Sequence, residues 1–175
     1  MKILISLVFL IGAGIVQASG ITVGHRPPVA ELAGDAGGRV DGTPWSSREL
    51  SGVVHILMYV DPDKVKTNEH VEKALKDAAF PEEKFKSIAM INLAASWKPK
   101  FVIDQVLKKK QKQYPKTIYV RDVNKLLVSA WGLLDQDYHV VAFDPEGKVL
   151  FSKGGSLSDD EVDTLLETIR SNISP

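Results

Sequence analysis

The chain has 175 residues, no cysteine, and 22 basic against 22 acidic side chains, so its formal net charge at pH 7 is zero. A balanced charge provides no general field that would attract nucleic acid or anionic lipid, and it argues against a nucleic-acid-binding function. Because there is no thiol, the chain acting alone can perform neither disulfide exchange nor thiol-dependent peroxide reduction.

The first 18 residues have the pattern of a secretory signal peptide. Lys2 gives a positive start, an apolar run follows from Ile3 to Val16, and the small residue Ala18 precedes the expected cleavage point. The alternative is a membrane anchor, but a spanning helix needs roughly 20 apolar residues and this run is shorter. We therefore expect residues 1–18 to be removed on export, leaving one periplasmic domain over residues 19–175 without a stable membrane anchor.

Two local patterns organise the segment that follows an extended, proline-containing lead-in. Residues Val29–Leu32 and Arg39–Asp41 flank the glycine-rich stretch 34–38, and this predicts an N-terminal β-hairpin. Next, Ser46–Glu49 has the sequence of a capping box, with hydrophobic residues on both sides placed as its staple. A short helical turn is therefore expected there.

The middle of the chain alternates strands with helices. Val53–Val60 is apolar on both faces, as expected of a strand covered by helices on both sides. After it, apolar residues recur at helical spacing until Pro81 ends the helix. Strands are predicted over 53–60, 85–93 and 117–121, and helices over 68–80, 99–113 and 123–131.

The last part of the chain predicts a closing hairpin and a final helix. His139–Phe143 and Lys148–Ser152 flank Asp-Pro-Glu-Gly at 144–147, which has the residue preferences of a type I turn. A second capping box, Ser158–Glu161, then opens a helix with an apolar stripe formed by Val162, Leu165, Leu166 and Ile169.

This order of elements predicts an α/β domain of three layers. Strands that alternate with helices make right-handed crossovers and a mostly parallel central sheet, to which the closing hairpin adds antiparallel strands. Together with the N-terminal β-hairpin, this is the topology of the thioredoxin-like fold.

Several short motifs, in order along nearly the whole exported part of the chain, resemble the YtfJ family. They are Ala79-Phe80-Pro81, Met90-Ile91-Asn92, Lys112 to Pro115, Ala130-Trp131, Val141 to Asp144 with Gly147-Lys148-Val149, and Lys153 to Leu157. The resemblance implies a periplasmic protein of thioredoxin-like fold that lacks the paired active-site cysteines. It implies no activity and no catalytic residues. The loop 61–67 is the part that resembles the family least.

The carboxyl end of the central strand is the candidate site, because ligands of open α/β sheets collect at that edge. We expect seven residues around one crevice there: Asp61, Asp63, Thr67, Asn68, Asn92, Tyr138 and His139. One hypothesis makes His139 or Asp61 a proton-transfer group. The alternative is a solvated polar loop in which Thr67 or Asn68 caps the next helix.

Other groups are weaker candidates. The histidines at positions 25, 55, 70 and 139 have no paired spacing, so we predict no metal and no cofactor. The run Lys108–Lys112 falls in the last turns of a predicted helix, where cations interact favourably with the helix dipole. The alternative is that this run contacts an anionic partner. Trp97 stands in a polar loop near the crevice and is the better candidate for an exposed contact.

The sequence favours a redox-inactive domain that binds a periplasmic protein, a peptide or a small ligand. The alternative is a thiol-independent periplasmic enzyme that uses Asp61, His139 or Tyr138 at the crevice. A purely structural envelope component is a third hypothesis, and no sequence feature supports it.

Overall fold

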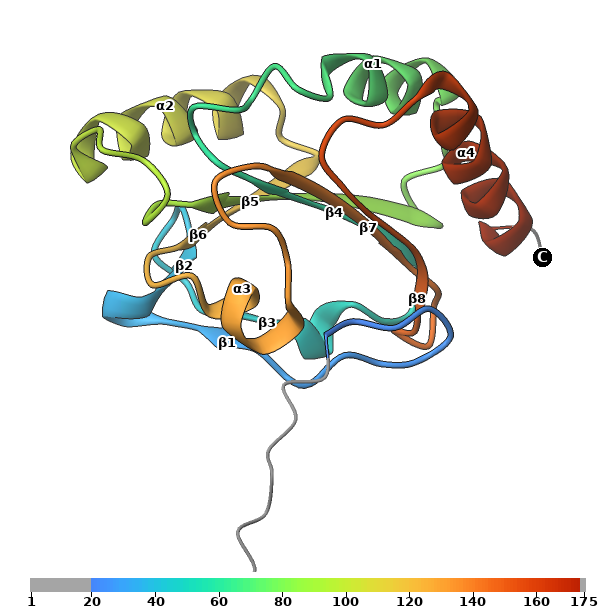
Figure 1. The fold of residues 1–175 in the computed structure, drawn as a ribbon, viewed down its shortest axis with the longest axis horizontal. Helices are drawn as coiled ribbons and strands as arrows, with labels where there is room; N and C mark the ends of the chain where they lie inside the picture. The colour runs from blue at the N-terminus through green and yellow to red at the C-terminus, as the bar shows by residue number, and fades with distance from the viewer. Residues whose placement is uncertain (1–19, 174–175) are drawn as a thin grey trace, which may run out of the picture.

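The computed structural model describes residues 20–173. The expected signal peptide, residues 1–18, lies outside them. A twisted sheet forms the middle layer; α1, α2 and α4 cover one face, and α3 lies on the other face with the N-terminal segment (Figure 1). No helix among the described residues is long and apolar enough to cross a membrane.

The central sheet has six strands in the order β2-β6-β5-β4-β7-β8. Its middle is parallel and consists of β4 (Val54–Val60), β5 (Phe85–Asn92) and β6 (Thr117–Asp122). The closing hairpin, β7 (Tyr138–Phe143) and β8 (Val149–Gly154), adds two antiparallel strands beside β4. The closing hairpin is therefore confirmed, whereas the sheet is mixed and not mostly parallel, because β2, β7 and β8 all pair antiparallel around the three parallel strands.

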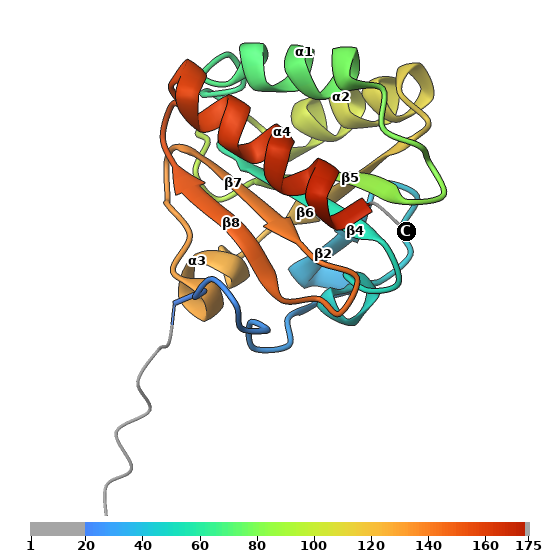
Figure 2. The same ribbon diagram turned by 90° about the vertical axis from the view of Figure 1, so that its right-hand side faces the viewer.

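The helices lie close to the predicted ranges. On one face, α1 (Glu69–Ala78) packs against α4 (Asp159–Ile173), as Figure 2 also shows, and α2 (Lys100–Gln113) packs against β6. On the other face, α3 (Leu126–Trp131) begins three residues later than predicted. The backbone of Lys125 is left-handed, with φ of 56°, so regular helix starts only after it.

Each face of the sheet has its own hydrophobic core. In β4, Ile56 and Met58 belong to the core under α1, α2 and α4, whereas Leu57 and Tyr59 belong to the core on the α3 face. Successive side chains of a strand point to opposite faces, so an apolar strand of this kind serves two cores at once.

The N-terminal segments find other partners than the predicted hairpin requires. β1 (Glu31–Leu32) pairs with β3 (Trp45–Ser46), and β2 (Gly37–Arg39) joins the central sheet against β6. The two segments predicted to pair with each other therefore form ladders with other strands instead. The reason lies in the glycines, because a Cβ on Gly37 would come within 1.9 Å of the Arg121 carbonyl oxygen. The glycines permit this close approach to β6 rather than serve a hairpin turn.

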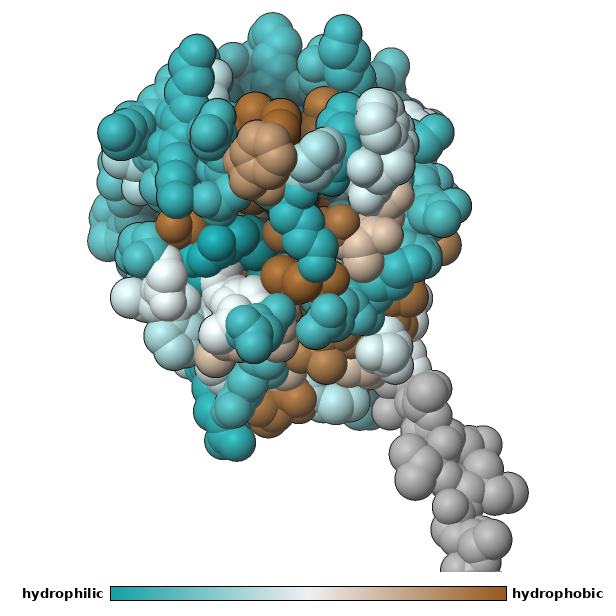
Figure 3. Space-filling model, turned by 90° about the vertical axis from the view of Figure 1, so that its left-hand side faces the viewer, coloured by the Kyte–Doolittle hydropathy of each residue, from teal (hydrophilic) through white to brown (hydrophobic). Residues whose placement is uncertain are grey.

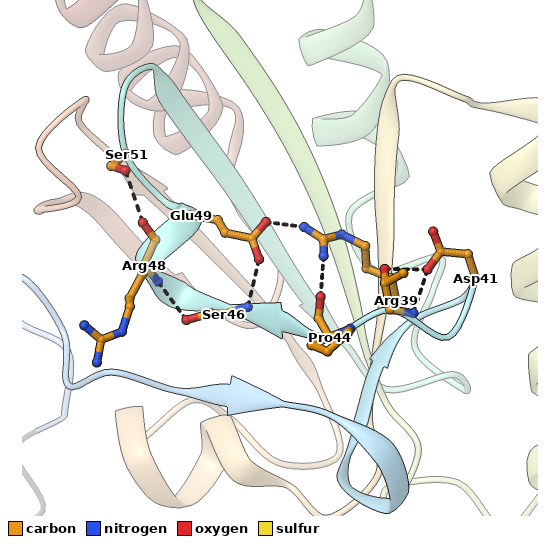
Figure 4. A network of polar contacts seen from close by, with 8 residues as sticks. Arg39, Asp41, Pro44, Ser46, Arg48, Glu49 and Ser51 are labelled. Atoms are coloured by element: carbon orange, nitrogen blue, oxygen red, sulfur yellow. Dashed lines mark hydrogen bonds and ion pairs between the residues drawn. The ribbon is translucent and has the colours of Figure 1, made fainter.

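The first capping box is present and is extended by an ion pair (Figure 4). The Ser46 N–H donates to Glu49 Oε1 at 3.0 Å, and the Arg48 N–H donates to Ser46 Oγ at 3.3 Å. Glu49 also pairs with Arg39, whose guanidinium donates to the Pro44 carbonyl. The box thus connects a single 3₁₀ turn, Ser47–Glu49, to the β2 segment.

Candidate functional site

The three parallel strands all end at one edge of the sheet, and the loops that follow them form the end of the molecule seen in Figure 3. Apolar surface gathers in the middle of that end and is surrounded by hydrophilic residues. Exposed apolar side chains come from three loops and the start of α2, namely Val65, Trp97, Phe101, Val102 and Leu134. This edge is the one at which the candidate crevice is expected.

The loop after β4 is closed by hydrogen bonds of its own. The Asp61 N–H donates to the Asp137 carbonyl at 2.9 Å, which joins this loop to the one before β7. The buried Asp61 carboxylate accepts the Asp63 N–H at 2.8 Å. Asp63 itself pairs with Lys98 and accepts the Ser96 hydroxyl, and the Lys98 hydrogen bond is the main cause that lowers the pKa of Asp63. Both carboxylates thus have partners within the protein.

Asn68 is fully buried and joins α1 to the segment before α4. Its Nδ2 donates to the Gly155 carbonyl at 2.9 Å, and its Oδ1 accepts the Leu157 N–H at 3.0 Å. The side chain makes no capping bond to α1, although Asn68 occupies the N-cap position. The neighbouring Thr67 contributes its carbonyl, which accepts the Ser156 hydroxyl at 3.4 Å.

Tyr138 and His139 are consecutive in β7 and therefore point to opposite faces of the sheet. The Tyr138 hydroxyl donates to Glu72 Oε1 at 3.1 Å, on the face covered by α1. On the other face, His139 Nδ1 accepts the Leu134 N–H at 3.2 Å, and Nε2 lies 2.9 Å from Ser152 Oγ. Both nitrogens of this imidazole are engaged, and burial lowers the pKa of His139 to about 4.

Asn92, the last residue of β5, belongs to a small polar cluster on the α3 face. Its Nδ2 donates to Asp135 Oδ1 at 2.9 Å, and Asp135 also pairs with Lys125. The Asn92 Oδ1 is buried without a hydrogen-bond partner among the described residues. The seven predicted residues therefore occupy three places: the loop above the sheet edge, the α1 face and the α3 face.

A groove that the sequence did not indicate runs over the sheet between α1 and α2; we call it the α1–α2 groove. It has a volume of about 1420 Å³. Its floor is formed by Met58, Val60, Ala89, Ile91, Tyr119 and Tyr138, and α2 contributes Val102, Ile103, Val106 and Leu107 to one wall. Pro62, Val65 and Lys98 line it at the carboxyl edge of the sheet. Of the seven predicted residues, Tyr138 alone is among those lining the groove.

The α1 wall of the groove carries more charged side chains than the α2 wall. Glu69, Glu72, Lys73 and Lys76 line it at helical spacing. Desolvation is the main cause that raises the pKa of Glu72, against the lowering effect of its hydrogen bond from Tyr138. Burial also raises the pKa of the Tyr138 hydroxyl, so this phenol stays protonated and remains a donor to Glu72.

The one signal that could have revealed the groove is the pattern of α2. Val102 and Val106 are one turn apart and remain 40% and 50% exposed, while the next residues along, Ile103 and Leu107, are buried in the core. Together the four residues form one broad apolar stripe, and the core buries only its Ile103–Leu107 side. No group of three or more potential metal-ligating side chains occurs within residues 20–173.

These features define a class: a three-layer α/β domain with a closing hairpin and no thiol at the end of its central strand. The fold is similar to that of a protein assigned as the thiol:disulfide interchange protein DsbE from Chlorobium tepidum. The TM-score is 0.65, with 16% sequence identity, and the match covers 89% of this chain and 100% of the other. The prediction of a thioredoxin-like fold is thereby confirmed.

The chain belongs to the family described as "Bacterial protein of unknown function (YtfJ_HI0045)", which it matches over residues 31–172. It is 26% identical over 130 residues to the uncharacterized protein YtfJ of Escherichia coli K12, a match covering 72% of this chain and 70% of YtfJ. It is 29% identical over 130 residues to an uncharacterized protein of Haemophilus influenzae Rd, with the same coverage. The resemblance seen in the sequence motifs is confirmed.

Proposed function

We propose that the protein is an exported, redox-inactive binding protein that holds a small apolar ligand in the α1–α2 groove. The observation that carries the proposal is the groove itself, with an apolar floor, an apolar α2 wall and a volume of about 1420 Å³. Sites for small molecules usually occupy about 300–1,000 Å³ and are lined mostly by apolar side chains with a few polar groups. The groove therefore has room for a ligand longer than an ordinary metabolite.

Exposed valines support this use of the groove. Leaving Val102 and Val106 in contact with water has no benefit for folding, since each is about half exposed and a group that covered the remainder would contribute up to about 1 kcal/mol of further burial. A bound apolar ligand would cover both side chains, and an exposed apolar surface of this kind is typical of a binding groove.

Two further parts of the proposal rest on the sequence. The chain has no thiol for redox chemistry, and its first 18 residues have the pattern of a secretory leader. We expect the processed protein in the periplasmic fraction of a Gram-negative host, with a mass that corresponds to cleavage after Ala18. Unprocessed protein found in the cytoplasmic fraction would contradict this part of the proposal.

The groove is tested with N-phenyl-1-naphthylamine, an uncharged apolar dye whose fluorescence rises on leaving water. We expect saturable binding to the full chain, weakened more than about tenfold by Val106→Asp, because a carboxylate would then face the apolar ligand. The matched control is Val29→Asp, since Val29 is a similarly exposed valine, at 52%, and does not line the groove.

The dye experiment has two outcomes that would reject the proposed site. One is the absence of saturable binding to the unaltered chain. The other is an equal loss of affinity in both aspartate variants, which would place the dye elsewhere or reflect a general effect of charge. Thermal unfolding of each variant checks that the fold is intact, and both substituted positions are exposed enough to tolerate aspartate.

A second candidate function, recognition of a partner protein, is favoured by two aromatic side chains at the carboxyl edge. Trp97 is 86% exposed and Phe101 is 67% exposed. Aromatic residues of this kind are common anchors of protein interfaces. A photo-crosslinking residue at position 97 should trap a discrete partner in living cells, whereas one at position 109, on an exposed part of α2, should not. Repeated failure to trap a partner at position 97 would count against this function.

A further inference from the structure

We propose that the ligand of the α1–α2 groove is a long-chain amphiphile with a single anionic head group, held near Lys76 and Lys110. This inference rests on the proposed function and adds the chemical class of the ligand to it. It rests on three observations: the distribution of charge around the groove, the absence of an ion-pair partner for some of its lysines, and the chemistry of the floor.

The side chains that line the groove carry a net positive charge, although the formal net charge of the whole chain is zero. Six lysines line it against three glutamates; they are Lys73, Lys76, Lys86, Lys98, Lys110 and Lys116, with Glu69, Glu72 and Glu82. In a chain whose basic and acidic residues are equal in number, this is a local concentration of cations. Such a concentration favours an anionic ligand through its effect on both encounter and binding.

Three of these lysines are already engaged by carboxylates. Lys73 pairs with Asp77, Lys98 with Asp63, and Lys116 with Glu82. In contrast, Lys76, Lys86 and Lys110 form no ion pair with any carboxylate in the described part of the chain. The positive charge that remains for a ligand is therefore on these three side chains.

Lys76 and Lys110 line the groove from opposite walls. Lys110, on α2, is near enough to Glu72 to lower the pKa of that carboxyl by its charge. Lys76 follows Glu72 by four residues and so lies one turn further along the same side of α1. Glu72 is held toward the floor by its hydrogen bond to Tyr138, so we expect an anionic head group to contact the Lys76 and Lys110 ammonium groups and to stay away from this carboxylate.

The rest of the groove suits an alkyl chain. The floor residues Met58, Val60, Ala89 and Ile91 and the wall residues Val102 and Val106 offer no side-chain hydrogen-bonding groups. A saturated chain requires none, and each methylene that it buries strengthens binding by about fourfold. The flexible stems of the lysines can also cover a chain while their ammonium groups reach solvent or the head group.

An extended peptide suits this floor poorly. The groove lies over side chains in the middle of the sheet and not along a strand edge, so it offers no backbone ladder to a bound strand. The unpaired backbone groups of such a peptide would be desolvated without compensation. An amphipathic helix avoids that penalty by its internal hydrogen bonds, and it is therefore the competing occupant that an experiment has to separate.

The test is calorimetric titration of the full chain with hexadecanoate, with hexadecan-1-ol and with a synthetic amphipathic helix that has an acidic face. We expect hexadecanoate to bind at least about fivefold more tightly than the alcohol, because only the acid meets the lysines as an anion. Shortening the acid to decanoate should weaken binding by a large factor, since six methylenes are lost. The helix should bind less tightly than hexadecanoate.

The charge at the groove is tested with Lys110→Glu and its matched control Lys109→Glu. The two residues are adjacent in α2, and Lys109 is exposed and does not line the groove. Lys110→Glu should weaken hexadecanoate binding by about tenfold and change alcohol binding little, whereas Lys109→Glu should change neither by more than about twofold. A circular-dichroism melt of each variant checks that the fold is intact.

Each other result has a defined meaning. Equal affinity for acid and alcohol, unaffected by Lys110→Glu, would overturn the anionic head group and leave an apolar ligand in place. Tighter binding of the helix than of hexadecanoate would overturn the amphiphile in favour of a protein partner. If neither the acid, the alcohol nor the naphthylamine dye bound, the proposed function itself would fail together with this inference.

Discussion

His139 illustrates how a residue that suggests catalysis in the sequence can have a structural role in the fold. Its two ring nitrogens are occupied by the Leu134 N–H and the Ser152 hydroxyl, and the ring is buried. Burial disfavours the imidazolium and lowers the pKa to about 4, although the charge of Asp137 acts in the opposite direction. The histidine is therefore neutral throughout the physiological pH range.

This depressed pKa predicts a loss of stability in mild acid. The unfolded chain takes up a proton near pH 6.5, whereas the folded protein resists protonation until about pH 4, so the contribution of His139 to stability is present above pH 6.5 and declines as the pH falls toward 4. We expect denaturant unfolding to report a decrease of a few kcal/mol over this interval.

The control for this experiment is His139→Asn, which cannot titrate. The variant should be less stable at neutral pH but should lose much of the decline between pH 6.5 and 4. If the variant and the unaltered chain showed the same decline, the acid sensitivity would belong to other groups.

Glu72 predicts the opposite dependence on pH. Desolvation raises the pKa of its carboxyl in the folded protein, so the protonated form is favoured by folding, and the benefit is lost as the pH rises through that pKa. Glu72→Gln removes the charge and keeps an oxygen that can accept the Tyr138 hydroxyl. We expect the variant to be as stable as the unaltered chain at pH 7, or more stable by up to about 1 kcal/mol.

The comparison variant is Glu72→Ala, which leaves the Tyr138 hydroxyl without its acceptor. It should be less stable than Glu72→Gln in chemical unfolding at pH 7. Equal stability of the two variants would mean that the hydrogen bond to Tyr138 contributes nothing measurable.

Asn68 acts between elements rather than within one. The N-cap position predicts a side chain that bonds the first turn of α1, but this amide instead bonds the backbone at Gly155 and Leu157. Two backbone groups of the segment before α4, one buried and one partly buried, therefore depend on a residue that lies almost ninety positions earlier in the chain. Local sequence rules cannot anticipate such a partner, because it is brought there by the packing of α1 on α4.

Replacement of Asn68 by alanine should therefore destabilise the fold strongly. The buried Leu157 N–H and the partly buried Gly155 carbonyl lose their partner at once, and an unsatisfied buried group costs about 1–3 kcal/mol. Thr67→Ala is the matched control, since Thr67 is bonded through its carbonyl and keeps that group in the variant. Chemical unfolding should show a loss of about 2–5 kcal/mol for Asn68→Ala and little change for Thr67→Ala; similar losses would contradict the assigned role.

The boundaries of the elements show where local patterns are sufficient. Turn and capping signals located the closing hairpin and the final helix well, as the Gly147 N–H bond to the Asp144 carbonyl and the reciprocal Ser158–Glu161 bonds confirm. Local patterns did not predict the residue at which α3 begins. There, the buried Asp122 carboxylate accepts the N–H groups of Leu126 and Leu127 from the end of β6, and nothing in the sequence marks it as a cap.

For the molecule as a whole, the absence of cysteine leads to a direct biochemical expectation. The full chain should neither accelerate the reduction of insulin by dithiothreitol nor consume hydroperoxides, because both reactions need a thiolate nucleophile. Thioredoxin, assayed in parallel, provides the positive control. Catalysis above background by homogeneous protein would show that the chain reacts by a route that its side chains do not suggest.

Hydrophobic periodicity, turn residues and capping boxes are local, and they were enough to give the order of elements and the fold class. The absence of a thiol is likewise a property of composition. The side chains of Tyr138 and His139 point to opposite faces of the sheet because the two residues are neighbours in one strand, and this too is a local property. The partners of β1 and β2 and the bonds of Asn68 required long-range packing. The α1–α2 groove did as well, because the apolar pattern of α2 does not by itself show that α4 and the sheet hold α1 apart from it and leave a space between the two helices.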